Sequence, residues 1–173
     1  MVKYFSKYRL YVIAGIIFLG VVSIFGYSKL SNPIDESFDA PGRNWNSPKK
    51  VEDYFIQNLR MTPQEAQEIR SKPGVDGTVD LRISNNTTLD ALVSNLAYYG
   101  FIRDEKSFRY ALGHTKDVTS SDNAIIVDKN RTIDKNAEYR ISEDMDAWQI
   151  ADILLNRPSG HFAFDEYNYF FMP

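Results

Sequence analysis

Hydrophobic residues follow three patterns along this chain of 173 residues. An unbroken uncharged run extends from Leu10 to Tyr27. Later segments either alternate apolar and polar residues, as a half-buried strand does, or repeat apolar residues at the spacing of one helix face. We therefore expect an α+β protein whose first element is a membrane-spanning helix.

The run at 10–27 has about 18 residues, close to the ~20 that cross ~30 Å of hydrocarbon. Lys3, Lys7 and Arg9 precede it, and this excess of basic residues predicts a cytoplasmic tail at 1–9 with the rest of the chain outside. A cleaved secretion signal is the competing interpretation, but the sequence after the run offers no A-x-A site. The pattern predicts a single-pass anchor.

Two segments separate this helix from the main domain. Residues 28–46 are rich in proline, glycine and small polar residues, which is typical of a linker without rigid structure. Residues 47–75 predict a helical segment that begins at Ser47-Pro48. A second helix starts inside it, where Thr62 caps, Pro63 opens and Glu65 completes a capping box.

The remaining residues, 76–173, predict one domain of alternating strands and helices. In the tail, Phe162 and Phe164 alternate with other residues and predict a final strand. The earlier elements are a strand at 78–84, a helix capped by Thr88 and ended by Gly100, a helix capped by Asp104 and ended by Gly113, and a strand at 124–127.

An internal repeat appears when the chain is shifted by about 58 residues. Segment 81–84 then falls on 139–142, and the cap Thr88 falls on Asp146. The apolar faces of the two following helices coincide as well, and Asp146 with Gln149 predicts another capping box. The domain is therefore expected to contain two strand-turn-helix units.

Composition narrows the chemistry. An apolar fraction of 43% with 11 Tyr and 11 Phe is sufficient for a packed core. The absence of cysteine excludes disulfides, thiolate metal sites and a cysteine nucleophile. The net charge of the chain is −3. All charged residues among the first 30 are basic, so the net charge of the remaining residues is more negative than −3. Phosphate backbones repel such a surface, and nucleic acid is not expected as a partner.

Two stretches resemble a known family. They are RISNNTTLDALVSNLAYYGFIRDEKSFRYAL, with the step Gly100-Phe101-Ile102 and Phe108, and AEYRISEDMDAWQIADILLNRP, with Tyr139, Met145, Ile150 and Leu154. Over residues 79–158 they resemble the module that precedes the catalytic half of the MltG/YceG-like endolytic murein transglycosylases. The resemblance implies a LysM-like, YceG-type domain at 76–173, attachment to the bacterial inner membrane with the domain facing the cell wall, and a role in cutting nascent glycan strands.

The chain departs from this family in its chemistry. The family's catalytic half carries an essential general-acid Glu in a recognisable motif, and no such motif occurs here. Three acids lie near aromatic residues, and we interpret Glu138 as a strand-edge residue, Glu143 as a turn residue and Glu166 as part of the tail. We expect no catalytic residue, and the chain as it stands is not expected to act as a peptidoglycan lyase.

Metal and cofactor chemistry also find no support in the sequence. His114 and His161 are the only histidines, and their spacing is not that of a metal site. They are interpreted as exposed loop residues. No glycine-rich phosphate loop is present, so neither a metal nor a cofactor is expected.

Aromatic residues supply the remaining candidates. Tyr98, Tyr99 and Trp148 are candidate glycan contacts, although aromatic residues more often pack in a core. Our first hypothesis is a non-enzymatic module that binds peptidoglycan glycan strands or docks on a wall-synthesis protein. The alternative is a truncated or split piece of an endolytic transglycosylase whose catalytic half is encoded elsewhere. An adaptor unrelated to the cell wall is a third possibility.

Overall fold

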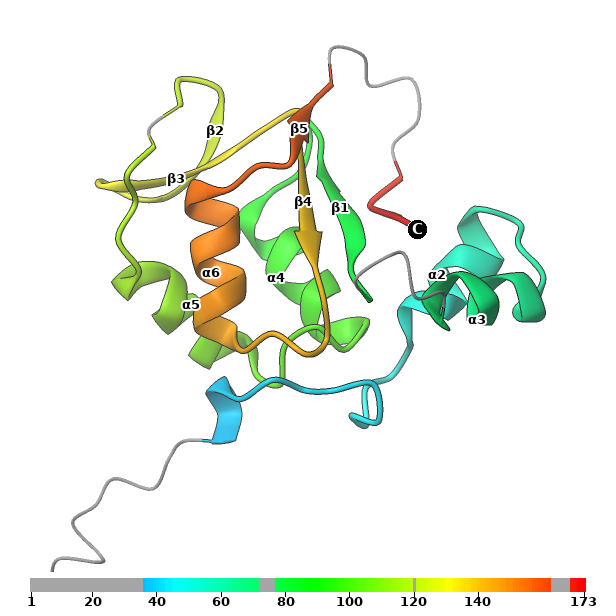
Figure 1. The fold of residues 1–173 in the computed structure, drawn as a ribbon. Helices are drawn as coiled ribbons and strands as arrows, with labels where there is room; N and C mark the ends of the chain where they lie inside the picture. Colours follow the sequence, from blue (N-terminus) through cyan, green and yellow to red (C-terminus); the bar gives the residue numbers. More distant parts are fainter. Residues whose placement is uncertain (1–35, 72–76, 120, 163–168) are drawn as a thin grey trace, which may run out of the picture. The chain divides into compact units, whose positions relative to one another are not determined.

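The computed structural model describes residues 36–71, 77–119, 121–162 and 169–173. Over these ranges the chain forms helices and two antiparallel sheets (Figure 1). The helices are the 3-10 helix η1 (Glu36–Phe38) and the α-helices α2 (Val51–Asn58), α3 (Pro63–Ser71), α4 (Leu89–Tyr98), α5 (Glu105–His114) and α6 (Ala147–Asn156). The strands are β1 (Val79–Ile83), β2 (Ala124–Asp128), β3 (Arg131–Asp134), β4 (Ala137–Ile141), β5 (Gly160–His161) and β6 (Phe171–Met172).

The larger sheet has the order β5-β4-β1-β6, and β2 and β3 form a separate hairpin. At its centre β1 pairs with β4, and Leu81 lies opposite Tyr139. Val79, Leu81 and Ile83 are buried while the residues between them are partly exposed. This is the period of two that the sequence predicts for a strand with one face on the core.

The two strand-turn-helix units correspond to β1 with α4 and β4 with α6. The bounds of the second pair follow those of the first at a constant offset. Leu81 and Tyr139, which the offset makes equivalent, are partners in the β1–β4 pair. The two units therefore pair about a local two-fold axis, and both helices turn an apolar stripe to the same side of the sheet.

The core lies between the β1–β4 pair and the helices α4, α5 and α6, which Figure 1 shows on one side of that pair. Leu92 and Leu96 of α4, Phe108 of α5 and Ile150 of α6 are fully buried in it. Tyr139 is also buried, and burial raises the pKa of its hydroxyl well above the ordinary value. That hydroxyl keeps a partner, since it donates to the Asp134 carbonyl oxygen over 3.3 Å.

Several predicted helix ends are confirmed. Thr88 caps α4, Asp104 caps α5, and Asp146 caps α6 in a capping box with Gln149. Each side chain satisfies a backbone N–H that the first turn leaves without a partner. Gly100 follows α4 with a φ of 83°, the left-handed conformation that the sequence predicts for it.

Other ends differ from the prediction because tertiary contacts override local signals. Helix α2 begins at Val51 rather than at Ser47-Pro48, because the backbone of Lys50 is extended, with a φ of −102° and a ψ of 158°. The Lys49 backbone N–H donates to the Tyr98 carbonyl oxygen. Gly113 does not end α5, which continues to His114. The predicted tail strand at 162–164 lies partly outside the described residues. The strands formed nearby are β5 and β6.

Residues 37–46, predicted as part of a linker without rigid structure, make specific contacts with the domain. The Phe38 ring stacks on Trp148 at 5.5 Å between centroids. The Gly42 backbone N–H donates to the Glu143 carbonyl oxygen over 2.7 Å. This stretch therefore forms part of the folded unit, and it supplies one wall of the site described below.

The predicted membrane anchor requires a correction. No helix in the described part of the chain is long and apolar enough to cross a membrane, and the predicted span at 10–27 lies outside the described residues. The longest described helices have 10 residues, about 15 Å, which is half of the ~30 Å hydrocarbon thickness. The fold class is therefore corrected to α+β with two antiparallel sheets. The transmembrane helix and the placement in a bacterial inner membrane, with a cytoplasmic tail at 1–9, are withdrawn.

Candidate functional site

An open groove of about 530 Å³ lies between the segment that precedes α2 and the C-terminal half of α4. We call it the α4 groove. Its lining combines two aromatic rings with amide, hydroxyl and charged groups. The lining residues are Trp45, Asn46, Ser47, Pro48, Ser94, Asn95, Ala97, Tyr98, Arg103 and Glu105.

The first wall is the segment around Trp45, which is held by contacts distant in sequence. The Arg103 guanidinium lies over the Trp45 ring at 4.8 Å from its centroid, a cation–π arrangement. Arg103 also donates to the Ala40 carbonyl oxygen from Nε and Nη2, over 3.2 and 2.9 Å. Lys50 donates from Nζ to the Trp45 carbonyl oxygen. Both the ring and the backbone of Trp45 are thus fixed.

The second wall is the end of α4 with the first turn of α5. Tyr98 is 42% exposed, because it lies on the side of α4 opposite the stripe of buried residues. Ser94 donates to Glu105 Oε1 over 3.2 Å. Asn95 donates from its side-chain amide to the Ala91 carbonyl oxygen over 2.8 Å, so its side-chain oxygen is available to accept a hydrogen bond.

Gly100 allows the two walls to approach each other. A Cβ atom at this position would lie 2.8 Å from Ser47 Oγ and 3.2 Å from Ser47 Cβ. Its φ of 83° also disfavours other residues. The glycine that ends α4 therefore also makes room for the segment that carries Trp45.

A second groove, of about 380 Å³, lies on the outer face of α6. Its lining mixes Trp148 with aliphatic, acidic, amide and basic side chains. The lining residues are Met145, Asp146, Trp148, Gln149, Asp152, Ile153 and Arg157.

The three predicted glycan contacts do not line one groove, although the Tyr98 and Tyr99 rings meet edge-on at 5.0 Å between centroids. Tyr98 lines the α4 groove and Trp148 the groove on α6. Tyr99 packs edge-on against Tyr54 and Phe171, and burial raises the pKa of its hydroxyl above the ordinary value. The three residues do not form one surface.

Trp45 is the residue that sequence reasoning missed. It lies in a stretch predicted as linker, and it has no hydrophobic periodicity around it. An available signal was a tryptophan isolated among polar residues in the sequence GRNWNSP.

The acids considered in the sequence do not lie in the α4 groove. Glu138 of β4 pairs with Arg82 of β1 across the sheet, at 2.8 Å from its Nε. Glu143 is buried against Arg70, and both of its carboxylate oxygens accept from the same guanidinium nitrogen. Glu166 lies outside the described residues. Both described acids are therefore held in ion pairs outside the α4 groove.

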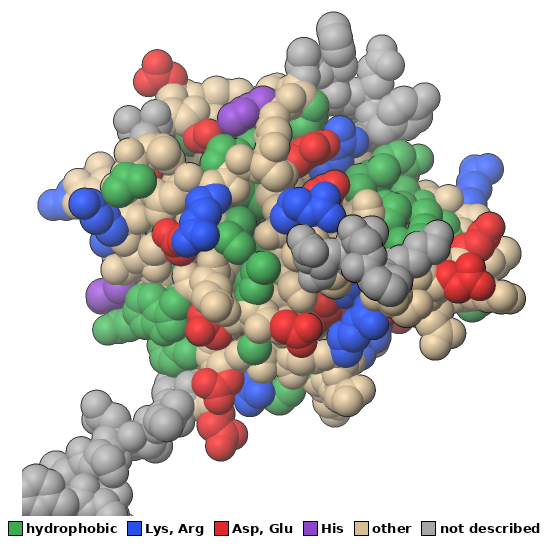
Figure 2. Space-filling view, in the orientation of Figure 1, with side chains coloured by type: hydrophobic (Ala, Val, Ile, Leu, Met, Phe, Trp, Pro, Cys, Tyr) green, Lys and Arg blue, Asp and Glu red, His purple; other side chains and the backbone are tan. Residues whose placement is uncertain are grey.

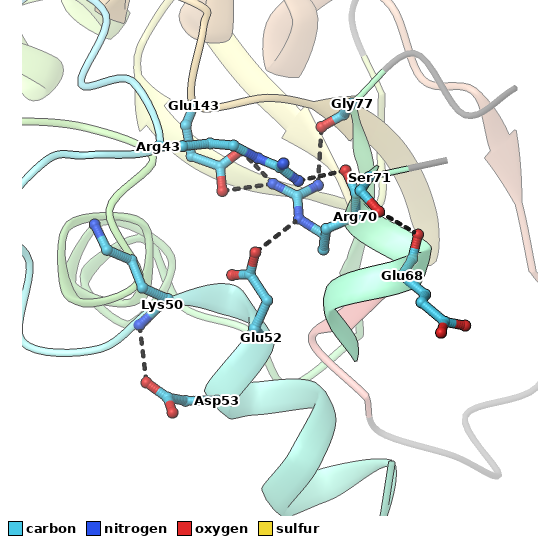
Figure 3. A network of polar contacts seen from close by, with 9 residues as sticks. All are labelled: Arg43, Lys50, Glu52, Asp53, Glu68, Arg70, Ser71, Gly77 and Glu143. Atoms are coloured by element: carbon cyan, nitrogen blue, oxygen red, sulfur yellow. Dashed lines mark hydrogen bonds and ion pairs between the residues drawn. The ribbon is translucent and has the colours of Figure 1, made fainter. Parts of the chain in front are cut away.

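Arg70 is the centre of a buried polar network (Figure 3). Its side chain is 2% exposed and that of Glu143 is 5% exposed. Besides Glu143, Arg70 contacts Glu52 of α2 at 3.7 Å and donates to the Gly77 carbonyl oxygen over 2.8 Å. Arg43 donates to the Arg70 carbonyl oxygen. The network thus joins α2, α3 and the loop after β4 to the stretch that leads to Trp45.

Both histidines are exposed, but they lie at the end of a helix and in a strand rather than in loops. His114, at the end of α5, stacks on Tyr110 at 3.8 Å between centroids. His161 of β5 lies 3.4 Å from Asp134 Oδ2. In the part of the chain that the structure describes, no three His, Asp or Glu side chains are grouped so that they could hold a metal ion.

Comparisons with known proteins give no relative from which a function could be transferred. No family model matches the chain, and no curated protein and no solved structure matches it. The two grooves are the surface features of the described residues that could hold a ligand.

Proposed function

We propose that this domain is a non-enzymatic binding module that holds a polysaccharide chain in the α4 groove. The observation that carries the proposal is the pairing of Trp45 and Tyr98 across a groove that is otherwise lined by amides, hydroxyls and one charged group of each sign. Sugar rings present C–H groups to an aromatic face and hydroxyls around their rim. A groove with both kinds of partner suits them.

The polar side chains favour a sugar over a purely apolar ligand. Asn46 and Asn95 offer amide groups that can donate and accept, and the Ser94 hydroxyl can do the same. Arg103 and Glu105 give the groove one charged group of each sign, and both can hydrogen-bond to sugar hydroxyls. Glycan strands of peptidoglycan are the first candidates, because residues 79–158 resemble a module of enzymes that act on them.

The carboxylate in the α4 groove favours binding of the glycan without cleavage. Among the described residues that line the α4 groove, Glu105 is the only carboxylate. It accepts a hydrogen bond from Ser94 and is partly exposed. A general acid that cleaves glycosidic bonds needs apolar walls that keep it protonated, and this position lacks them.

The test measures binding of the full chain to uncrosslinked peptidoglycan glycan strands by titration calorimetry. A chitin oligomer and an α-glucan serve as comparison ligands. Trp45→Ala and Tyr98→Ala should each weaken binding about fivefold, because one ring contact is worth about 1 kcal/mol. Tyr110→Ala removes an equally large exposed ring outside the groove and should leave binding unchanged.

Two results would count against the proposal. The first is no binding to any of the three glycans, and the second is equal binding by the wild type and both groove variants when their melting temperatures agree. Release of anhydro-sugar products would contradict the non-enzymatic part. Loss of that release in Glu105→Gln would then identify the acid responsible.

A further inference from the structure

A second surface, unrelated to the α4 groove, is formed by three aromatic rings from distant parts of the chain. Phe38 stacks on Trp148 at 5.5 Å, and Tyr110 meets both rings edge-on, at 5.9 Å from Phe38 and 6.0 Å from Trp148. We call this cluster the aromatic face. In Figure 2 a hydrophobic patch is exposed at the lower left, where Figure 1 places η1, α5 and α6.

Two of the three rings, Tyr110 and Trp148, are not needed to fill the core, whereas Phe38 is half-buried and packs against it. The buried stripe of α6 consists of Ile150, Ala151, Leu154 and Leu155, with Ala147 beside it. Trp148 points away from that stripe and is 38% exposed, and Tyr110 is 52% exposed. A contiguous exposed group of large rings on a small domain is typical of an interaction surface.

The groove on α6 extends this surface. Trp148 belongs to both features, and Met145 and Ile153 add aliphatic side chains to the groove. Together they form a concave strip along the outer side of α6, in which these apolar side chains lie beside polar and charged ones. Its volume of about 380 Å³ suits a few side chains that project from one segment of a partner.

Acidic side chains lie in the groove and next to aromatic and apolar residues of this surface in the chain. Asp39 and Asp144 are exposed, and they neighbour Phe38 and Met145 in the chain. Asp146 lines the groove itself. No described basic side chain forms an ion pair with any of these three aspartates. By contrast Asp152, in the same groove, is already paired with Arg157.

We propose that the aromatic face and the groove on α6 dock a basic amphipathic segment of a partner protein. Its aliphatic side chains enter the groove beside Trp148, and its Lys or Arg side chains face Asp39, Asp144 and Asp146. These aspartates select this occupant, because they repel anionic lipid headgroups and phosphate backbones but attract basic residues.

The probe is a synthetic peptide of about four helical turns, with Leu on one face and Lys on the other. Binding to the full chain is measured by fluorescence anisotropy. The control peptides replace Lys by Glu, or scramble the order so that no apolar face forms. The Leu/Lys peptide should bind at least about tenfold more tightly than either control, since both charge and amphipathicity contribute.

Variants locate the site. Trp148→Ala and Tyr110→Ser should each weaken binding of the Leu/Lys peptide about tenfold. Asp144→Asn should weaken it about threefold and lower its salt dependence, because screening then has less attraction to remove. Ile126→Ser, which replaces a side chain that is 73% exposed on β2, should have no effect.

The proposal is overturned if the Leu/Lys peptide does not bind, binds no better than the scrambled peptide, or binds Trp148→Ala and Tyr110→Ser as it binds the wild type. Sedimentation of the chain alone gives a further test. Self-association that disappears in Tyr110→Ser would show that a second copy is the occupant, and would overturn the proposed basic partner. Failure here leaves the glycan proposal intact, because Trp45 and Tyr98 belong to the other groove.

Discussion

At the scale of single residues, Asp104 shows how one side chain defines a helix start. Its carboxylate accepts from the Ser107 backbone N–H over 2.8 Å and from the Ser107 hydroxyl over 2.9 Å. The backbone hydrogen bond is the main cause that lowers the pKa of Asp104 below its ordinary value. Such a group stabilises the fold above its ordinary pKa and ceases to do so as the pH falls through the lowered value.

The lowered pKa of Asp104 leads to a prediction for Asp104→Asn. Asparagine also caps a helix but does not titrate. The wild type should be more stable than the variant by about 0.5 kcal/mol at pH 7, a modest figure because solvent screens the side chain. The difference should shrink toward zero below about pH 4. Urea unfolding at pH 7, 4 and 3 measures it, and a constant difference over that range would contradict the assignment.

At the scale of elements, the two strand-turn-helix units place equivalent residues in equivalent positions. Leu92 of α4 and Ile150 of α6 are both fully buried. Each follows the N-cap of its helix at the same distance, since Thr88 and Asp146 are the caps. The same local pattern therefore produces the same burial in both copies.

Leu92→Asp and Ile150→Asp should accordingly each unfold the domain. A buried carboxylate without a partner costs several kcal/mol, a large part of a typical stability of about 5 to 15 kcal/mol. Circular dichroism and thermal melting of the full-length variants measure the effect. Ala91→Asp, on the exposed side of α4, is the matched control and should melt like the wild type. Cooperative melting of either buried variant at the wild-type temperature would contradict the equivalence.

At the scale of the whole molecule, the Arg70–Glu143 pair connects parts of the chain that are 73 positions apart. Arg70 comes from α3, and Glu143 from the turn between β4 and α6. The Glu143 carbonyl oxygen also holds Gly42, on the way to Trp45. One buried pair thereby fixes the helical segment and the wall of the α4 groove on the same domain.

A double-mutant cycle tests this pair. Arg70→Met should destabilise the protein by about 3 kcal/mol, because it leaves the Glu143 carboxylate buried without its partner. Glu143→Leu should cost somewhat less, because Arg70 keeps its contacts with Glu52 and the Gly77 carbonyl oxygen. The double variant should lose clearly less than the sum, with a coupling energy of about 2 kcal/mol or more. The exposed pair of Arg157 and Asp152 is the control, and its coupling should stay below about 1 kcal/mol. Equal coupling energies for the two pairs would show that burial does not set the strength of the Arg70–Glu143 pair.

Much of the local structure follows from the sequence alone. The alternation in β1, the caps Thr88, Asp104 and Asp146, and the left-handed Gly100 all depend on residues within a few positions of one another. When a side chain and a backbone group are only a few positions apart, local geometry alone brings them together. These features were predictable for that reason. The family resemblance at 79–158 stays a prediction.

Tertiary structure alone decided where the surfaces lie. Tyr98 and Tyr99 are neighbours of identical type, yet one lines a groove and the other packs against Tyr54 and Phe171. Trp45 forms a wall of the α4 groove because Arg103 packs on its ring from a distant part of the chain. Phe38 is held in the same way by the ring of Trp148. Such contacts depend on how whole elements pack, since burial of apolar area has no direction and does not specify which distant side chains meet. The sequence by itself therefore determined β1, β4 and the helices α4, α5 and α6 with their N-caps, whereas packing determined both grooves.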